Sequence, residues 1–446
     1  MDTDRTTAPL RVAFKSIGCK LNQYEADALK FGFDNAGCRI VPFGDRADVY
    51  VINTCTVTGS GDSDSRKAVR RARRTNPEAT VVATGCYAHR RPNELEEAGA
   101  SLVVDNAGKS NLHERLSAHL GHQGRDLEIP PDAVSPSGFL QQRGAVDLGR
   151  TRGALQIQDG CDEHCTYCII PGVRGPGRSR PIPEILDQAE AMAAAGYREL
   201  ALTGVHTGSY GYDRQEPEAL VSLLERMDAI EGLSRVRLNS VEPGYFSEAL
   251  IEFAATSEKL CRHFHVPLQS GDDQVLRRMG RRYLRAEYRK LVETLAKRVP
   301  KCAIGADVMV GFPGESDRQF DGALAFIGDL PLTYLHVFSY SQRSGTAAER
   351  LTAHQPADTK KHRSRQLIRL GERKRLDFHQ QHVGDEIEVL VEDENVNGTS
   401  LSSGLSDNYI KTLFAPSEPG VNRFDVVRIE RAREDLVFGE TALQSG

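Results

Sequence analysis

Three cysteines, Cys161, Cys165 and Cys168, lie close together in the stretch GCDEHCTYC at residues 160–168. Their spacing, Cys-x3-Cys-x2-Cys, indicates a metal-binding loop, because three thiolates so near in the chain can converge on one centre. A zinc site normally closes with four ligands, and His164 or a distant cysteine could supply the fourth. A [4Fe–4S] cluster also normally takes four thiolates, so three would leave one iron open for a substrate or cofactor.

Three further cysteines, Cys19, Cys55 and Cys86, are far apart in the sequence, but each follows an expected strand and precedes an expected helix. In a parallel sheet such loops meet at one edge, where helix N-termini favour thiolates and an anionic cluster. From topology alone, a shared cluster site and three separate buried cysteines are nearly equally expected. The other three cysteines are expected to be packing residues: Cys38, Cys261 and Cys302.

The elements that must position these cysteines alternate between strands and helices, which predicts a parallel sheet covered on both faces. For a first domain, residues 10–122, we expect strands at 11–17, 48–53 and 80–84, a loop at 18–23, and helices at 24–35, 63–75 and near Pro92. Residues 123–146 lack clear periodicity and are expected to be a linker.

The alternation resumes in residues 147–377, where six strand–helix units favour a full or partial barrel over an open doubly wound sheet. The expected strands are 154–158, 199–203, 235–239, 263–267, 302–309 and 334–338, with helices such as 183–195, 215–230, 286–298 and 359–375. In residues 378–446, β-rich segments at 386–391, 408–414 and 424–430 predict a small β-barrel.

The cysteine loop resembles that of the radical S-adenosylmethionine (radical SAM) enzymes, with Cys-x3-Cys-x-Tyr-Cys after a first barrel strand. The resemblance implies that Cys161, Cys165 and Cys168 hold a [4Fe–4S] cluster whose open iron binds SAM, and that an electron from the cluster cleaves SAM to a 5′-deoxyadenosyl radical. It also implies SAM contacts from Tyr167 at the adenine, Thr203 and Gly204 at the methionine amine, and Ser240 and Glu242 at the ribose or carboxylate. The family pattern at the second strand is Gly-Gly-Glu, from which Leu202-Thr203-Gly204 departs.

The N-terminal cysteine motifs resemble those of the methylthiotransferases: GCKLNQYE at 18–25, NTCTV at 53–57 and TGCYA at 84–88. This implies an α/β protein with a Rossmann-like N-terminal domain, a (β/α)6-type partial TIM barrel and an all-β TRAM barrel. It also implies a second, auxiliary [4Fe–4S] cluster on Cys19, Cys55 and Cys86. In this family one SAM methylates a sulfur carried on the auxiliary cluster and a second SAM supplies the radical, with an external electron donor and sulfur source.

Family members differ in substrate. GCKLNQYE and the stretch NYIK at 408–411 most resemble the group that modifies N6-threonylcarbamoyladenosine. We therefore expect methylthiolation at C2 of that nucleoside at position 37, in the anticodon loop of tRNA. The alternatives are isopentenyl-adenosine in tRNA, an aspartate of a ribosomal protein or, in another class, a non-catalytic metal-bearing protein that binds RNA.

The chain has 446 residues and a net charge of −5, from 57 basic and 62 acidic residues, and its length suggests about three domains. It has neither an apolar run of roughly 18 residues nor a signal-like start, so we expect a cytoplasmic protein without a membrane partner. Residues 66–74, 277–290 and 359–375 are strongly basic and favour RNA, although residues 376–446 carry a net −9, with 5 basic and 14 acidic residues. No DNA partner is expected.

Overall fold

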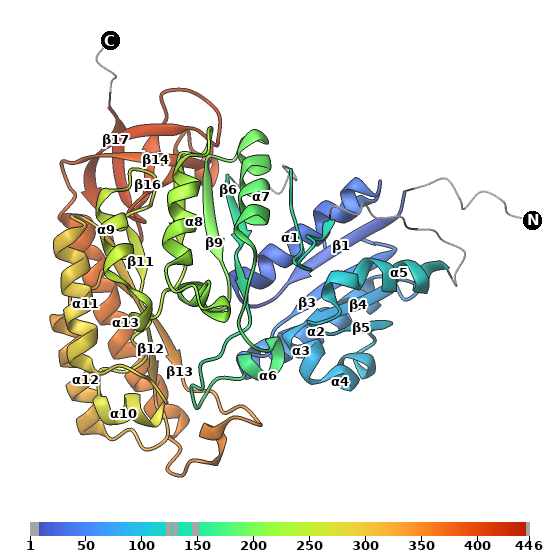
Figure 1. Ribbon diagram of the computed structural model, residues 1–446, viewed down its shortest axis with the longest axis horizontal. Coiled ribbons are helices and arrows are strands. Elements are labelled where there is room, and N and C mark those ends of the chain that lie inside the picture. The colour runs from blue at the N-terminus through green and yellow to red at the C-terminus, as the bar shows by residue number, and fades with distance from the viewer. Residues whose placement is uncertain (1–8, 122–126, 128–132, 145–150, 443–446) are drawn as a thin grey trace, which may run out of the picture.

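The computed structural model describes residues 9–121, 127, 133–144 and 151–442 (Figure 1). An N-terminal parallel sheet, a central array of parallel strands and a C-terminal closed barrel follow one another along the chain. Within these described ranges, no helix is long and apolar enough to cross a membrane.

The N-terminal sheet has the strand order β2-β1-β3-β4-β5, with every pair parallel. Every residue of its strands β3 and β4 is buried, as expected for parallel strands covered on both faces. The strands are β1 (Arg11–Ser16), β2 (Arg39–Val41), β3 (Val49–Thr54), β4 (Thr80–Gly85) and β5 (Leu102–Val104). The helices are α1 (Lys20–Asn35), α2 (Gly59–Thr75), α3 (Cys86–Arg90), α4 (Pro92–Glu97) and α5 (Leu112–Gly121).

The prediction of a loop at 18–23 is largely wrong, because α1 begins at Lys20 and places Cys19 at its N-cap. Leu21 and Tyr24 are buried, so the first turn of the helix is held against the core of the sheet. Gly18 makes the turn out of β1 with a φ of 101°, a conformation that other residues rarely adopt.

The central strands run in chain order as two three-stranded parallel sheets, joined by a bridge between Val236 and Leu260. This order confirms a partial barrel and lacks the reversal of a doubly wound sheet. Leu200 and Val236 face the helices outside, whereas Glu199 and Arg237 pair on the inner side. The strands are β6 (Arg152–Gln156), β9 (Glu199–Thr203), β10 (Arg235–Leu238), β11 (His263–His265), β12 (Ala303–Val310) and β13 (Tyr334–Ser339).

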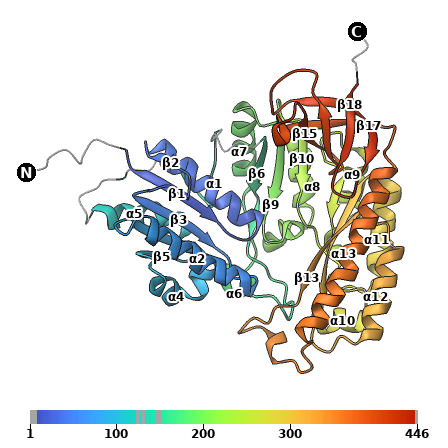
Figure 2. The same cartoon turned by 180° about the vertical axis from the view of Figure 1, so that it is seen from behind.

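Helices cover the outer side of this half-barrel; Figures 1 and 2 show α11, α12 and α13 beside β11, β12 and β13. The helices are α6 (Ile170–Arg174), α7 (Ile182–Ala194), α8 (Ala219–Asp228), α9 (Glu248–Thr256), α10 (Asp273–Arg278), α11 (Arg285–Arg298), α12 (Asp317–Asp329) and α13 (Ala357–Gln380). The helix expected at 215–230 starts later, at Ala219, because Gln215 has a left-handed φ of 61°.

The C-terminal barrel closes in the order β14-β15-β16-β18-β17. Its strands are β14 (Glu386–Asp393), β15 (Ser402–Ser406), β16 (Lys411–Ala415), β17 (Phe424–Ala432) and β18 (Val437–Thr441). The strand expected at 408–414 begins only at Lys411, because Tyr409 has a left-handed φ of 68° in a turn closed by Ser406.

The expected linker falls partly outside the described residues, and its described residues, 127 and 133–144, include several that are buried. Phe139 and Leu140 are buried, and the hydroxyl of Tyr24 donates to the Leu140 carbonyl at 2.7 Å. These residues therefore connect α1 with the central half-barrel. The domain boundaries themselves stay a prediction.

Candidate functional site

The loop with three cysteines leaves the half-barrel through the short strand β7 (Gln158–Asp159), which pairs with β8 (Arg178–Ser179). A side chain at Gly160 would lie 1.8 Å from the Pro176 carbonyl, so only glycine fits there. The backbone N–H of Cys161 donates to the Gly175 carbonyl at 3.1 Å, and the backbone N–H of Cys168 donates to the Cys165 carbonyl at 3.0 Å. The fold thus fixes three half-buried thiols on one loop.

Burial, with a smaller contribution from the neighbouring Cys165, raises the pKa of Cys161 to about 11 and the pKa of Cys168 to about 12. The thiols of Cys161 and Cys168 are therefore protonated at neutral pH without a metal, and metal binding would release their protons. Three sulfur donors on a partly exposed loop fit a three-thiolate [4Fe–4S] site with one open iron.

A cavity of about 320 Å³ opens beside Cys165. Arg281 lies in its wall, pairs with Glu242, and donates to Cys165 Sγ at 3.2 Å and to the Tyr167 hydroxyl at 3.5 Å. The cavity is also lined by acidic and aromatic side chains, including Glu163 and Tyr245. Its position next to the open side of the loop is suitable for SAM. The sequence assigned no role to Arg281, which belongs to the basic run at 277–290.

The five residues predicted to contact SAM do not all reach this cavity. Glu242 lines it, and Tyr167 touches Arg281 in its wall. The cavity lining does not include Thr203, Gly204 or Ser240. Thr203 is buried, and Gly204 packs against Gln158. The Ser240 carbonyl accepts a hydrogen bond from the Thr207 hydroxyl at 2.5 Å. Their roles stay predictions.

The second triad forms where three strands of the N-terminal sheet end. Cys19 occupies the N-cap position of α1, Cys55 follows β3, and Cys86 is the first residue of α3. A side chain at Gly18 would lie 2.6 Å from Cys55 Sγ, so the first loop packs directly on the second. The Thr54 hydroxyl donates to the Thr84 carbonyl at 2.6 Å, which joins the second loop to the third.

The three thiols of this triad act on one another electrostatically. Burial raises the pKa of Cys55 to about 11, and both Cys86 and Cys19 add to the rise. Burial also raises the pKa of Cys19, where Arg174 opposes the rise and Cys86 adds to it. The structure thus brings together three cysteines that are distant in the sequence. A set of three sulfur donors fits an auxiliary [4Fe–4S] site.

Residues of the central half-barrel reach this auxiliary triad through two asparagines. Arg174 donates to Asn22 Oδ1 at 2.7 Å, and the same oxygen lies 3.8 Å from Cys19 Sγ. Asn106 Nδ2 lies 3.6 Å from Cys86 Sγ and donates to the Val173 carbonyl at 2.7 Å. Because Val173 and Arg174 end α6, shortly after Cys168, one short helix links the two triads.

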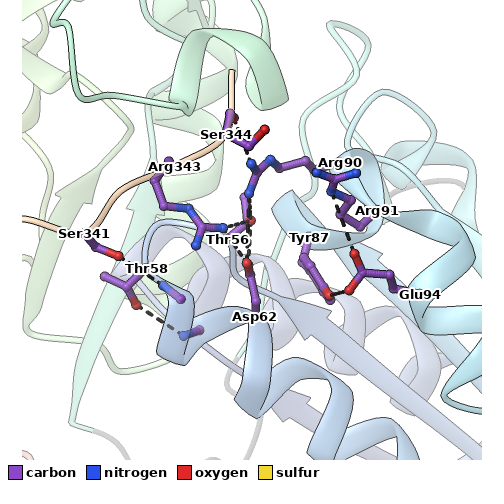
Figure 3. Close-up of polar contacts among 12 residues, drawn as sticks. Thr56, Thr58, Asp62, Tyr87, Arg90, Arg91, Glu94, Ser341, Arg343 and Ser344 are labelled. Atoms are coloured by element: carbon purple, nitrogen blue, oxygen red, sulfur yellow. Dashed lines mark hydrogen bonds and ion pairs between the residues drawn. The ribbon is translucent and has the colours of Figure 1, made fainter. Parts of the chain in front are cut away.

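A second link comes from the loop after β13 (Figure 3). Arg343 donates to Thr56 Oγ1 at 2.9 Å and pairs with Asp62, while Arg90 donates to the Ser344 carbonyl at 2.8 Å. A few residues later, the Ala348 N–H donates to the carbonyl of Thr166, between Cys165 and Cys168, at 2.8 Å. The loop at 341–348, which we name the bridging loop, thus contacts both cysteine regions.

Several other polar side chains of the half-barrel have structural partners. His206 Nδ1 accepts from the Ser209 N–H at 3.1 Å, and His265 Nε2 lies 3.0 Å from Asp307. Glu315, in the turn after β12, is buried in an ion pair with Arg363 of α13. As expected, Cys38, Cys261 and Cys302 are buried.

The basic runs are partly used inside the protein. In the run at 66–74, Arg73 donates to the carbonyls of Pro77, Ala79 and Gly99. In the run at 277–290, Arg285 and Arg289 both lie over the Phe326 ring. These arginines are half-buried and contact other parts of the protein, so fewer of the donors in these runs are free to contact phosphates than the counts suggest.

Comparisons with known proteins agree with this architecture. A family model described as the Radical SAM superfamily matches residues 155–327, and one described as Uncharacterized protein family UPF0004 matches residues 11–105. A radical S-adenosylmethionine methyltransferase from Kitasatospora setae, TsrM, matches with a TM-score of 0.55 over 74% of this chain and 75% of its own. At 17% identity, that likeness shows the fold alone.

Relatives of known activity match along nearly the whole chain. The threonylcarbamoyladenosine tRNA methylthiotransferase MtaB of Bacillus subtilis is 37% identical over 94% of both chains. The MtaB protein of Aquifex aeolicus is 38% identical over 90% of this chain and 96% of its own. A tRNA-2-methylthio-N(6)-dimethylallyladenosine synthase of Desulfitobacterium hafniense is 31% identical over 98% of each.

Proposed function

This chain belongs to the radical SAM family of tRNA methylthiotransferases, and we propose that it methylthiolates C2 of N6-threonylcarbamoyladenosine at position 37 of tRNA. The observation that carries the choice of nucleoside is the identity to two MtaB proteins, 37% and 38%, against 31% to the dimethylallyladenosine synthase. The proposed setting is the cytoplasm, with tRNA as partner and an external electron donor and sulfur source.

We assign one [4Fe–4S] cluster to Cys161, Cys165 and Cys168, and an auxiliary one to Cys19, Cys55 and Cys86. Together with SAM, these groups supply the radical and the methylthio group of the reaction. The protein's own residues hold the reactants: Arg281 fixes Glu242 in the wall of the cavity beside Cys165, and Tyr167 lies against Arg281.

The dimethylallyladenosine activity is the second candidate, because relatives with that name cover 98% of this chain. The two nucleosides differ at the substituent on N6. This substituent is a hydrocarbon in dimethylallyladenosine and carries a carboxylate in threonylcarbamoyladenosine. The two candidates therefore require different side chains around that substituent.

Anaerobically reconstituted protein tests the proposal with two anticodon stem-loop RNAs, one carrying each nucleoside, in the presence of SAM and a reductant. Mass spectrometry of the digested RNA should detect the methylthio product from threonylcarbamoyladenosine, formed at least about tenfold faster than from dimethylallyladenosine. A preference for the dimethylallyl RNA would overturn the choice of nucleoside.

A further inference from the structure

Lys20 is a cation placed between the two domains that carry the cysteine triads. It is the first residue of α1, directly after Cys19. Its ammonium group donates to Asn239 Oδ1 at 3.2 Å, and Asn239 directly follows β10 of the half-barrel. Asn239 also lies immediately before the segment of Ser240 and Glu242 that is predicted to contact SAM. The contact therefore lies between the auxiliary triad and the expected SAM site.

Lys20 has no counter-ion within the part of the chain that the structure describes. Its charged neighbours are Arg152, Arg237 and Glu199. The carboxylate of Glu199 is already paired with Arg237 at 2.7 Å, and Arg152 is paired with Glu392 at 2.5 Å. The surroundings of Lys20 thus carry an excess of positive charge that an anionic ligand would balance.

The side-chain amide of Asn239 has a donor to spare. Its oxygen accepts from Lys20, whereas its Nδ2 group has no hydrogen-bond partner among the described residues. An ammonium and an amide N–H side by side form a pair of donors that matches the two oxygens of a carboxylate. A hydrocarbon substituent could accept a hydrogen bond from neither group.

We propose that Lys20 and Asn239 bind the carboxylate of the threonylcarbamoyl group of the substrate and so determine its selection over dimethylallyladenosine. This inference rests on the proposed function, since only that nucleoside carries a carboxylate on its N6 substituent. The pair lies between Cys19 of the auxiliary triad and the segment of Ser240 and Glu242 predicted to contact SAM, so an adenine bound between the two triads would bring its N6 substituent close to it.

The test measures equilibrium binding of cluster-loaded protein, without reductant, to fluorescent stem-loop RNAs at one salt concentration. One RNA carries threonylcarbamoyladenosine and the other its methyl ester, which has lost the charge but keeps the shape. Because both RNAs present the same phosphates, the ratio of their dissociation constants isolates the carboxylate contact. Wild-type protein should bind the acid about 10- to 100-fold more tightly than the ester.

Lys20→Met and Asn239→Leu should both reduce the preference for the acid over the ester, and Lys20→Met should nearly abolish it. Lys20→Arg should keep most of this preference. Lys15→Met, which removes an exposed lysine of β1, is the matched control and should leave the ratio unchanged. Iron content and circular dichroism verify that each variant is folded and loaded. The inference is overturned if Lys20→Met prefers the acid as strongly as wild type, or if wild type itself shows no preference.

These results are distinguishable from a failure of the proposed function. If wild-type protein methylthiolates only the dimethylallyl RNA, the choice of nucleoside is wrong. If it methylthiolates threonylcarbamoyladenosine while Lys20→Met retains full selectivity, the function holds and the carboxylate site is wrong.

Discussion

The guanidinium of Arg343 donates to Thr56 Oγ1 at 2.9 Å, across 287 positions of the chain. Thr56 directly follows Cys55 of the auxiliary triad, and the loop that carries Arg343 also contacts Thr166 of the other cysteine loop through the Ala348 N–H. Arg343 is buried and pairs with Asp62 as well. The bond thus fixes one triad relative to the other.

Arg343→Leu should uncouple the two uses of SAM without removing any cysteine. With Asp62 left to its longer 3.9 Å ion pair with Arg90 and the bridging loop released from Thr56, the variant should form several-fold more 5′-deoxyadenosine per methylthiolated product. The spin–spin interaction between the two reduced clusters, measured by electron paramagnetic resonance, should also change. Arg343→Lys should partly restore both readouts, and Arg350→Leu, an exposed change nearby, should match wild type. Unchanged coupling and spectra in Arg343→Leu would contradict a positioning role.

The two triads should have separable functions. Cys161→Ala should abolish SAM cleavage, whereas Cys55→Ala should keep uncoupled cleavage and lose methylthiolation. Iron and acid-labile sulfide should fall from about eight per chain in anaerobic wild-type protein to about four in each variant. Methylthiolation retained by Cys55→Ala would refute the auxiliary role, and zinc without iron in the wild type would refute the radical chemistry.

Glu25 should make the interface between the domains sensitive to acid. Burial alone would raise its pKa, but Arg174 and Lys109 outweigh burial and lower the pKa to about 2 from its usual 4.5. Because the folded pKa is depressed, this stabilisation is complete above about pH 4.5 and is lost as the pH falls toward 2. Glu25→Gln would leave the buried Lys109 without its counter-charge and Arg174 with Asp159 as its remaining partner, which costs about 3–5 kcal/mol.

Denaturant unfolding at pH 7 should show that loss in Glu25→Gln, and its stability should depend less on pH between 4.5 and 2 than that of wild type. Glu114→Gln provides the control on an exposed helix position. Equal unfolding midpoints for Glu25→Gln and wild type at pH 7 would rule out this role of the ion pairs.

The fold could be predicted largely because its strands are hydrophobic runs of ordinary length separated by helices. The three-stranded core of the N-terminal sheet and β12 follow this pattern, whereas β10 (RVRL) and β11 (HFH) alternate polar and apolar residues. β15 was missed because its sequence, SSGLS, is polar and small, and its place depends on pairing with β14 and β16. The early start of α1 was missed because its first turn is stabilised by packing of Leu21 rather than by a capping side chain.

The site was predictable only where its residues are cysteines with recognisable spacing or placement. The residues that connect the triads, Arg174 and Arg343, lie in unremarkable local sequence, and their partners are 149 to 287 positions away. Arg281 was hidden within a basic run for the same reason. Charge counts could not separate arginines that pair internally from those free to contact RNA, and only the contacts of Arg73 or Arg363 make that distinction.

The most direct test of the account is nucleoside mass spectrometry of tRNA from cells in which the gene has been deleted. The account predicts that 2-methylthio-N6-threonylcarbamoyladenosine disappears, that unmethylthiolated N6-threonylcarbamoyladenosine accumulates, and that the methylthio derivative of dimethylallyladenosine is unaffected. A complementing copy should restore the lost nucleoside, whereas a copy with Cys55→Ala should not. Unchanged 2-methylthio-N6-threonylcarbamoyladenosine in the deletion strain would contradict the account.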